Sequence, residues 1–380
     1  MSNKRPKILF FGYPAKAMDY TGGFLWMKKV ADQIEDSNRY SVFKSYVHGN
    51  TKRVVHRLCY KIRDLIKTII YSPDVAIIDS WGESSIAVWL ILRLFRKNTK
   101  IFIVFHHYEE RIPLCKNFIE TFYNFLIEGI VSVMLRNSDI ILTVSKSSME
   151  DLKSIYDIGK GINKDIERNE ILFTNNMNTN KIAIVGTGID VDLLDMIIRR
   201  KKKLEKKKDI DFLCMGRIEK FFQLEKIWVK IKTLRPDSNL VMTGRTSPEM
   251  INKLSSIGID HRGFVSEEEK IDLYSRAKVF IFPSSKEGFG IAVAEALFLG
   301  IPVIAWKIPV FEDLYSKMGE TKINLMEFGN VDLFVEEAIK AIDKYNLNAQ
   351  SNAVFNKPNL VFPTWKSVAQ NVISVIEYTR

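Results

Sequence analysis

The sequence predicts an α/β protein with two doubly wound parallel sheets. Short apolar runs alternate with helical patterns along most of the chain, as in successive βαβ units. The 380 residues exceed the ~100–200 residues typical of one domain. A basic tract from Arg199 to Lys208 interrupts the alternation, and the same pattern then restarts. Two α/β domains joined near this tract are therefore expected.

The first half begins with a buried strand at Ile8–Phe11, followed by Gly12 and Pro14. Apolar residues recur at helical spacing from Gly23 to Ile34, which predicts a helix there. The later elements expected in this half are a strand at Asp74–Asp79, a helix at Ser84–Arg96, a strand at Lys100–Phe105, a helix at Phe118–Leu135, a strand at Ile140–Val144 and a helix at Ser147–Ile155.

The second half repeats the alternation. Its expected strands are Asp211–Met215, Asn239–Thr243, Val279–Phe282 and Pro302–Ala305, and its expected helices are Leu224–Leu234, Ser247–Ile257, Ser266–Ala277 and Gly290–Gly300. A last helix is expected over Thr364 to Tyr378, with Trp365 and Val368 on its apolar stripe.

These elements define the expected domains. Residues 1–200 form the first, 201–208 a basic linker, and 209–363 the second. The tract itself reads either as a solvated linker or helix face, or as an anion-binding arm. Open α/β sheets bind ligands beyond the carboxyl ends of their strands, so we expect the site in a cleft between the domains.

Composition limits the function classes. Apolar residues make up 46% and charged residues 27%, which excludes collagen-like, disordered and disulfide-scaffold proteins. The net charge of +11 favours an anionic partner such as nucleic acid, anionic lipid or a phosphorylated small molecule. The widely spaced cysteines Cys59, Cys115 and Cys214 indicate reduced thiols. No run reaches the ~18–20 apolar residues of a membrane span, and the first apolar run is too short for a signal peptide.

The most informative stretch is FIFPSSKEGFGIAVAEALFLGIPVIA, from Phe280 to Ala305. A strand, a glycine-containing loop and a helix follow one another, so free N–H groups at the helix start can bind a diphosphate. Glu287 precedes the helix, and Glu295, eight residues later, projects from inside it. A carboxylate there can accept hydrogen bonds from a ribose diol. A capped surface helix with ordinary glutamates is the competing interpretation.

Three further motifs follow expected strands. One expected strand ends at Gly216, and the cations Arg217 and Lys220 follow within one turn. These side chains either bind a phosphate group or are simply solvated. The first expected helix begins at Gly22 and Gly23. These glycines either belong to the site or simply form a turn before the helix. His106 and His107 follow the strand KIFIVF, where a histidine either faces the site or is structural.

Several of these motifs resemble those of a known protein family. GFVSEEEKIDLYSRAKVFIFPSSKEGFGIAVAEALFLGIPVIA is similar to the C-terminal signature of the group-one glycosyltransferases, and FLCMGRIEK and LVMTGR resemble its preceding motifs. TGGFLWMKKVADQI, SDIILTVSKSSMEDL, VGTGIDVDLL and TWKSVAQNVISVIEY resemble N-domain stretches and the closing helix. The resemblance implies a retaining glycosyltransferase of the GT-B fold, with two Rossmann-like domains facing across a cleft. The first would be the acceptor domain, to which the C-terminal helix at 364–380 returns, and the second would be the nucleotide-sugar donor domain.

The resemblance also implies roles. Arg217 and Lys220 would bind the donor diphosphate, Glu295 the ribose, and Glu287 the donor sugar beside the reacting carbon. Gly216 would lie beside the phosphates, and the backbone near Phe264 would contact the base. The sugar and phosphates would accept hydrogen bonds from the backbone N–H groups of Gly288, Phe289, Gly290 and Ile291. From the first domain, Gly22 and Gly23 would face the phosphates or the acceptor, and His106, or alternatively His107, would contact the donor sugar.

Some residues depart from the family pattern. Arg217 and Lys220 are closer together than usual, and KIPVFED replaces a glycine-containing loop after PVIAW. Lys226 and Lys230 are poorer alternatives for the phosphate cation. Asp190-Val191-Asp192 looks like the DxD metal motif of another fold, but we expect no metal and no cofactor. The donor would be a UDP- or GDP-linked sugar.

The acceptor is not specified by a motif. We expect a glycan or lipid-linked acceptor and a cytoplasmic location at the inner face of the cell membrane. The segments SSIAVWLILRLFRK and NFIETFYNFLIEGIVSVMLRN are either buried core helices or a shallow contact with an anionic membrane. The alternatives to a transferase are a nucleotide-sugar epimerase of the same fold and a non-catalytic partner of a transferase. Nucleic-acid binding through the basic tract is not expected.

Overall fold

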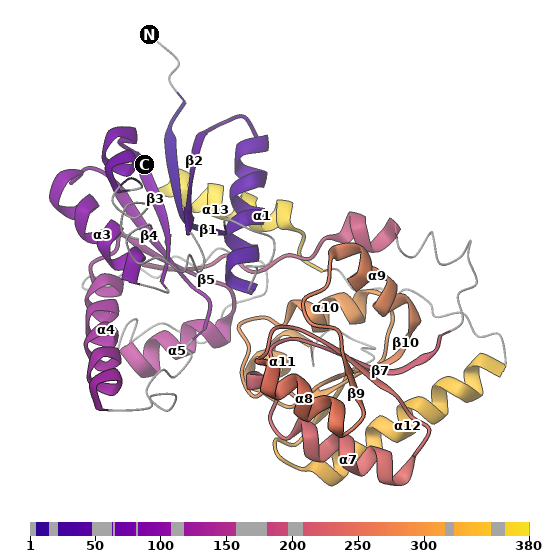
Figure 1. The fold of residues 1–380 in the computed structure, drawn as a ribbon. Helices are drawn as coiled ribbons and strands as arrows, with labels where there is room; N and C mark the ends of the chain where they lie inside the picture. The colour runs from indigo at the N-terminus through magenta and orange to yellow at the C-terminus, as the bar shows by residue number, and fades with distance from the viewer. Residues whose placement is uncertain are drawn as a thin grey trace. The chain divides into compact units, whose positions relative to one another are not determined.

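The computed structural model describes residues 5–14, 22–47, 63, 65–80, 83–107, 118–156, 181–196, 208–315, 323–350 and 362–379. The chain divides into two compact units (Figure 1). The first unit combines Met1–Gly188 with Pro363–Arg380, and the second is Ile189–Phe362. The cysteines Cys59 and Cys115 and most of the basic tract lie outside the described residues, whereas Cys214 is a buried free thiol whose pKa is raised by burial.

The first unit contains a six-stranded parallel sheet among its described residues. Its strands are β1 (Lys7–Pro14), β2 (Ser41–Val47), β3 (Val75–Asp79), β4 (Lys100–Phe105), β5 (Ile140–Thr143) and β6 (Lys181–Ile184). Their order across the sheet is β2-β1-β3-β4-β5-β6, so the winding reverses between β1 and β3. The all-buried sequence of β3, VAIID, fits a strand covered on both faces.

The helices of the first unit are α1 (Gly22–Asp36), α3 (Glu83–Phe95), α4 (Phe118–Arg136), α5 (Lys146–Tyr156) and α13 (Trp365–Tyr378). The helices α3, α4 and α5 share one core with the inward residues of the sheet, including Leu9, Ile78 and Ile103. The helix α13 packs against α1. Gly188 lies so close to α13 that a Cβ there would be 2.4 Å from the Trp365 nitrogen, and Asn371 Nδ2 donates to the Val185 carbonyl at 3.1 Å.

The second unit has its own six-stranded parallel sheet among the described residues. Its strands are β7 (Ile210–Met215), β8 (Leu240–Thr243), β9 (Ile259–His261), β10 (Ala277–Phe282), β11 (Val303–Trp306) and β12 (Ile323–Met326). The order β12-β11-β10-β7-β8-β9 is that of a Rossmann fold, with reversal between β7 and β10.

The helices of the second unit are α7 (Leu224–Leu234), α8 (Pro248–Ser256), α9 (Glu267–Arg276), α10 (Ile291–Phe298), α11 (Pro309–Tyr315) and α12 (Val331–Gln350), and a 3-10 turn, η3, spans Ile218–Lys220. Ser247 and Ser266 cap α8 and α9 by accepting backbone N–H groups of their first turns. The expected fold class, two doubly wound α/β units with the C-terminal helix packed on the first, is confirmed.

Candidate functional site

The topology of the second unit places two loops beside each other. The strands β7 and β10 are neighbours, and the chain leaves them in opposite directions across the sheet. Ligands of open α/β sheets bind at this reversal, beyond the carboxyl ends of the strands. The loops that start there are Gly216–Lys220, after β7, and Pro283–Gly290, after β10. These loops carry most of the residues that the sequence predicts for the site.

The two loops are joined by backbone hydrogen bonds. Phe222 N–H donates to the Pro283 carbonyl at 2.8 Å, and Ser285 N–H donates to the Lys220 carbonyl at 2.9 Å. Phe221 and Ser284 form the antiparallel bridge between them. Because the backbones are held in register, residues from distant parts of the sequence meet at a defined position.

Lys220 and Glu287 are brought together by this pairing. Lys220 Nζ lies 4.0 Å from Glu287 Oε2, and the Glu287 side chain is only 16% exposed. Ser284 Oγ donates to Glu287 Oε1 at 3.0 Å. The serine therefore orients a carboxylate whose other oxygen faces a cation. Sequence reasoning did not select Ser284, although its position three residues before Glu287 in the loop could have suggested it.

The start of α10 is shaped by Gly290. Its φ of +81° is in the left-handed region, and a Cβ there would lie 2.6 Å from Phe311 Cε1. Tyr315 Oη donates to the Phe289 carbonyl at 3.0 Å, which ties the loop to α11. Burial, and then the nearby charge of Glu287, raise the pKa of Tyr315, so its hydroxyl keeps its proton. Sequence reasoning missed both aromatic residues of α11.

The helix α10 has no side-chain cap. Gly290 occupies the N-cap position, and its missing side chain leaves the first turn of backbone N–H groups to other acceptors. Gly288, Phe289 and Gly290 are buried, and Ile291 is half-buried. The positive end of the helix dipole also lies here, so an anion is favoured at this position.

Glu295 is the most enclosed of the predicted charged residues, with 6% exposure. Lys270 Nζ donates to its Oε1 at 2.9 Å, and Tyr274 Oη lies 3.0 Å from its Oε2. Burial alone would lower the pKa of Lys270, but the charges of Glu295 and Glu267 raise it, so the ammonium stays charged. Each carboxylate oxygen can accept a second hydrogen bond, which leaves capacity for a ligand hydroxyl.

Sequence reasoning selected neither Lys270 nor Tyr274. Both are polar residues one turn apart on α9, in the stretch EEEKIDLY. That spacing could have indicated a common target, but not that the target is a glutamate of α10.

The remaining predicted residues of the second unit lie at the same edge of the sheet. Arg217 is half-buried and directly precedes η3. Phe264 follows β9, is 40% exposed, and lies under the Arg245 guanidinium at 5.8 Å. Gly244, after β8, approaches Gly216 so closely that a Cβ would lie 1.9 Å from the Gly216 carbonyl oxygen. The glycines thus allow the β7 and β8 loops to pack backbone against backbone.

The first unit brings another predicted pair together. Gly22 and Gly23 begin α1, and a Cβ on Gly23 would lie 2.9 Å from His106 Cδ2. His106 is buried after β4, and its ring meets the edge of the Trp26 ring at a centroid distance of 5.9 Å. His107 is half-buried. Only a glycine at position 23 leaves room for this imidazole.

Within the described ranges, no group of His, Cys, Asp and Glu side chains is arranged to hold a metal ion. Asp190 Oδ1 instead accepts the Leu193 N–H at 3.3 Å, as a local turn would require. In the same part of the chain, no helix has both the length and the apolar character needed to cross a bilayer.

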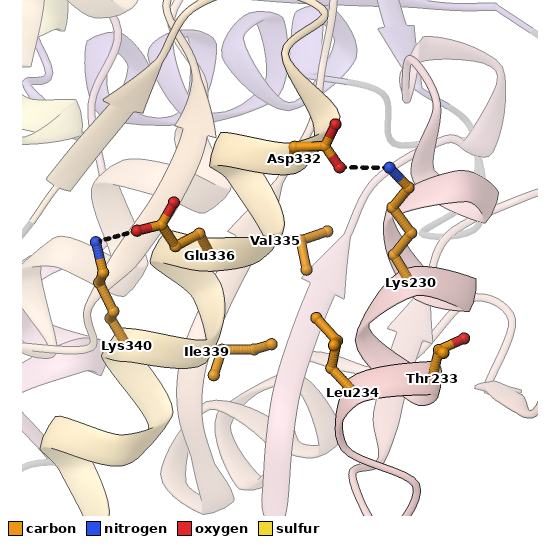
Figure 2. Close-up of a pocket in the computed structure, with 8 residues that line it drawn as sticks. All are labelled: Lys230, Thr233, Leu234, Asp332, Val335, Glu336, Ile339 and Lys340. Atoms are coloured by element: carbon orange, nitrogen blue, oxygen red, sulfur yellow. Dashed lines mark hydrogen bonds and ion pairs between the residues drawn. The ribbon is translucent and has the colours of Figure 1, made fainter.

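A pocket of about 440 Å³ lies elsewhere in the second unit. Figure 2 shows that it lies between α7 and α12, where Lys230 pairs with Asp332 and Lys340 pairs with Glu336. None of the residues assigned to the candidate site lines it. Lys230, a weaker candidate for the phosphate cation, is thus engaged with a partner on α12.

The chain is similar to known proteins in sequence and in fold. Residues 195–354 match the model of the family described as glycosyl transferases group 1. The chain is 27% identical over 260 residues to the O-antigen chain mannosyltransferase RfbU of Salmonella typhimurium. That alignment covers 60% of this chain and 62% of RfbU, so it spans somewhat less than two thirds of the relative.

Solved structures share the whole fold. Sucrose-phosphate synthase from Thermosynechococcus elongatus aligns with a TM-score of 0.65 at 13% identity, covering 99% of each chain. Anabaena HepE, solved in complex with UDP-glucose, aligns with a TM-score of 0.61 at 12% identity, covering 98% of this chain and 99% of HepE. The chain therefore shares the GT-B fold of these structures, and residues 195–354, within the second unit, are similar to the group 1 glycosyl transferases.

Proposed function

We propose that this protein transfers a sugar from a nucleoside diphosphate to a glycan or lipid-linked acceptor, with retention of the anomeric configuration and without a metal ion. The observation that carries the proposal is the meeting of Lys220, Glu287 and the start of α10 at the strand-order reversal of the second unit. A cation, a carboxylate and a helix start without a side-chain cap, all at one strand edge, suit a sugar linked to a diphosphate.

The proposed donor site uses each group according to its chemistry. Arg217 and Lys220 bind the diphosphate together with the first amides of α10 and the loop backbone at Gly216. Glu295, which accepts a hydrogen bond from Lys270, accepts the ribose hydroxyls. Glu287 accepts hydroxyls of the donor sugar, and Phe264 marks the backbone that meets the base.

The proposed chemistry is a displacement at the anomeric carbon. The bond from this carbon to the phosphate oxygen breaks, and a bond to the acceptor oxygen forms on the same face. The acceptor proton passes to the departing phosphate oxygen. Negative charge grows on the diphosphate as the bond breaks, and preorganised cations and amides stabilise that charge, each by ~2.7–4 kcal/mol in the transition state. No protein nucleophile is required.

The first unit would supply the acceptor side of the reaction. Gly22 and Gly23 present the start of α1, and His106, fixed beside Gly23, contacts the donor sugar. Because RfbU is named as an O-antigen chain mannosyltransferase, a mannose donor and a glycan acceptor are the first substrates to test. The proposal includes peripheral contact with the inner face of the cell membrane.

A ligand screen tests the donor site. UDP-, GDP- and ADP-sugars are added to the purified protein, and thermal unfolding is followed. The matching donor, at a hundred times its Kd, should stabilise the protein by ~2.7 kcal/mol. Arg217→Ala and Glu295→Ala should abolish the shift, whereas Arg262→Ala, an exposed arginine paired with Asp260, should keep it. Shifts that persist in both site variants would contradict the assignment.

Product analysis tests the reaction. NMR of the product should show the anomeric configuration of the donor, and activity should survive EDTA. Release of nucleoside diphosphate only with acceptor present separates a transferase from an epimerase. Donor binding with no turnover on any acceptor would instead favour the non-catalytic partner role.

A further inference from the structure

The outward face of α4 in the first unit is unusually apolar. From Phe122 to Val133, every exposed position of this helix carries an apolar or aromatic side chain or a glycine. The exposed large side chains are Phe122, Tyr123, Phe125, Leu126, Ile130 and Val133. Surface helices normally turn charged residues to water, so this face departs from the usual pattern.

The neighbouring helix α3 has the same property. Its exposed described positions are Leu90, Leu94 and Phe95, and Phe95 is 63% exposed. Both helices pack on the same side of the sheet, through Val88 and Leu92 of α3 and Ile127 and Val131 of α4. Their opposite faces therefore point away from the sheet together. We call the exposed apolar residues of α3 and α4 the α3–α4 face.

The end of this face is tied together and is basic. Arg93 donates to the Asn137 carbonyl and to Asp139, which joins the C-terminal ends of α3 and α4. Arg96 donates to the Ile69 carbonyl, which attaches the helical residues 65–71. Lys67, Lys97, Lys100 and Arg136 are exposed around this end. Among the α3 and α4 side chains that the structure describes, no exposed one is acidic.

The second unit provides a comparison within the same chain. The long helix α12 exposes Asp332, Glu336, Lys340 and Lys344 along most of its outer face. A helix of similar length in this chain therefore follows the usual pattern. The apolar face of α4 is thus a local property of the α3–α4 layer and does not reflect the chain's composition.

We propose that the α3–α4 face docks on an anionic bilayer surface, with its aromatic and aliphatic side chains at the headgroup boundary and the cations at its end on acidic lipid headgroups. An apolar helical face with exposed Lys and Arg at one end is the chemistry that such a surface recognises. The net charge of +11 acts in the same direction. This inference deepens the membrane contact of the proposed function, and it assigns that contact to particular residues.

Co-sedimentation with vesicles tests the assignment. The full chain is mixed at low salt with vesicles of phosphatidylcholine alone or with 30% phosphatidylglycerol (about a third anionic lipid). The wild type should sediment with the anionic vesicles at least fivefold more than with the neutral ones, and 0.5 M salt should reduce this binding. Binding equal on both vesicle types, or no binding at all, would overturn the proposal.

Paired variants locate the surface. Leu94→Ser/Phe95→Ser on α3 and Phe125→Ser/Leu126→Ser on α4 should each reduce sedimentation at least fivefold. Leu234→Ser/Leu347→Ser, which removes equally exposed leucines from the second unit, should leave it unchanged. Lys97→Glu/Lys100→Glu should weaken binding to anionic vesicles only. Unchanged binding in both serine pairs would refute the α3–α4 face.

Two readouts separate this idea from its alternatives. Phe125→Trp should be quenched by brominated lipid, whereas Leu347→Trp should not. If the face instead joins two copies of the chain, sedimentation velocity will show a dimer that the serine pairs dissociate, and quenching will be absent. Nucleotide-sugar binding should be normal in the serine pairs. Wild-type protein that binds vesicles but no nucleotide would reject the proposed reaction and retain the docking surface.

Discussion

At the scale of single residues, the candidate site depends on glycine positions where a Cβ atom would collide with a neighbouring residue. Gly290 and Gly258 have nearly the same backbone angle, with φ values of +81° and +79°. A Cβ at Gly290 would collide with Phe311, whereas nothing lies within 4 Å of one at Gly258. Substitutions at these two glycines therefore distinguish the cost of backbone strain from the cost of steric crowding at the start of α10.

Gly290→Ala should lower the free energy of unfolding by roughly 2–4 kcal/mol, because strain and the Phe311 clash add. Gly258→Ala carries only the strain and should cost about 1 kcal/mol. Urea unfolding followed by circular dichroism measures both. Equal losses in the two variants would show that Phe311 moves aside without cost.

Lys270→Met should destabilise the second unit by about 3 kcal/mol, because it leaves the carboxylate of Glu295 buried without its cation. The double variant Lys270→Met/Glu295→Gln should recover part of this loss, since it removes the unpaired charge. Urea titrations of the single and double variants give the comparison. A double variant less stable than Lys270→Met would contradict this explanation.

The sequence could identify some site residues and not others for a physical reason. Glu287, Gly288 and Gly290 lie in one short loop between a strand and a helix, where local chemistry is visible in a few letters. The Lys270–Glu295 pair joins α9 to α10 across 25 residues, and the Lys220–Glu287 approach needs the backbone pairing of two loops. Contacts of this kind exist only after the sheet has formed.

At the scale of secondary-structure elements, the sequence predicted best those helices and strands whose apolar spacing or capping residues are clear. The helix α7 has the bounds expected from its apolar spacing, and Ser247 and Ser266 cap helices where the sequence places their starts. The strands β9 and β12 were not predicted, because Ile259–His261 and Ile323–Met326 lack the continuous buried run that marks the four-residue strand β8. The helix α12 was also missed, although Phe334, Val335 and Ala338 follow helical spacing.

The contact between α1 and β2 contributes a stability that depends on pH. Asp32 lies between Lys28 of α1 and Lys44 of β2, with Nζ to Oδ distances of 2.5 Å to each. Burial would raise the pKa of Asp32, but the two lysines outweigh it and hold the pKa below its ordinary value of 3.8. Stability from these pairs is therefore complete above pH 3.8 and is lost as the pH falls through the lowered pKa.

Asp32→Asn should therefore cost about 1 kcal/mol at pH 7 and less at pH 3. Chemical unfolding of the variant and the wild type at both pH values measures the difference. Lys28→Met alone should produce a smaller loss, because Lys44 remains. A cost for Asp32→Asn that does not change with pH would exclude the ion pairs as its source.

At the scale of the whole molecule, the two units have separate sheets and separate cores. Separate cores can unfold in separate transitions, and a ligand stabilises only the part that it binds. The net charge of +11 acts over the whole chain, whereas the α3–α4 face belongs to the first unit and the proposed donor site to the second. The proposed donor site and the proposed docking face therefore lie in different units and can be perturbed one at a time.

Scanning calorimetry of the full chain should resolve two transitions. The donor nucleotide-sugar should raise the midpoint of one, and Glu295→Ala should abolish that rise without moving the other. Leu94→Ser/Phe95→Ser should affect neither midpoint strongly, because the side chains are exposed. A single transition that shifts as a whole would show that the units unfold cooperatively.

The return of α13 to the first unit has a consequence for biosynthesis. Ribosomes make a chain from its amino end, and the helix that packs on α1 follows the whole second unit in the sequence. The second unit, being uninterrupted, can therefore close while translation continues. The earlier-made unit must wait, with the α1 surface that α13 covers left open to chaperones, until residues 363–379 have emerged from the exit tunnel.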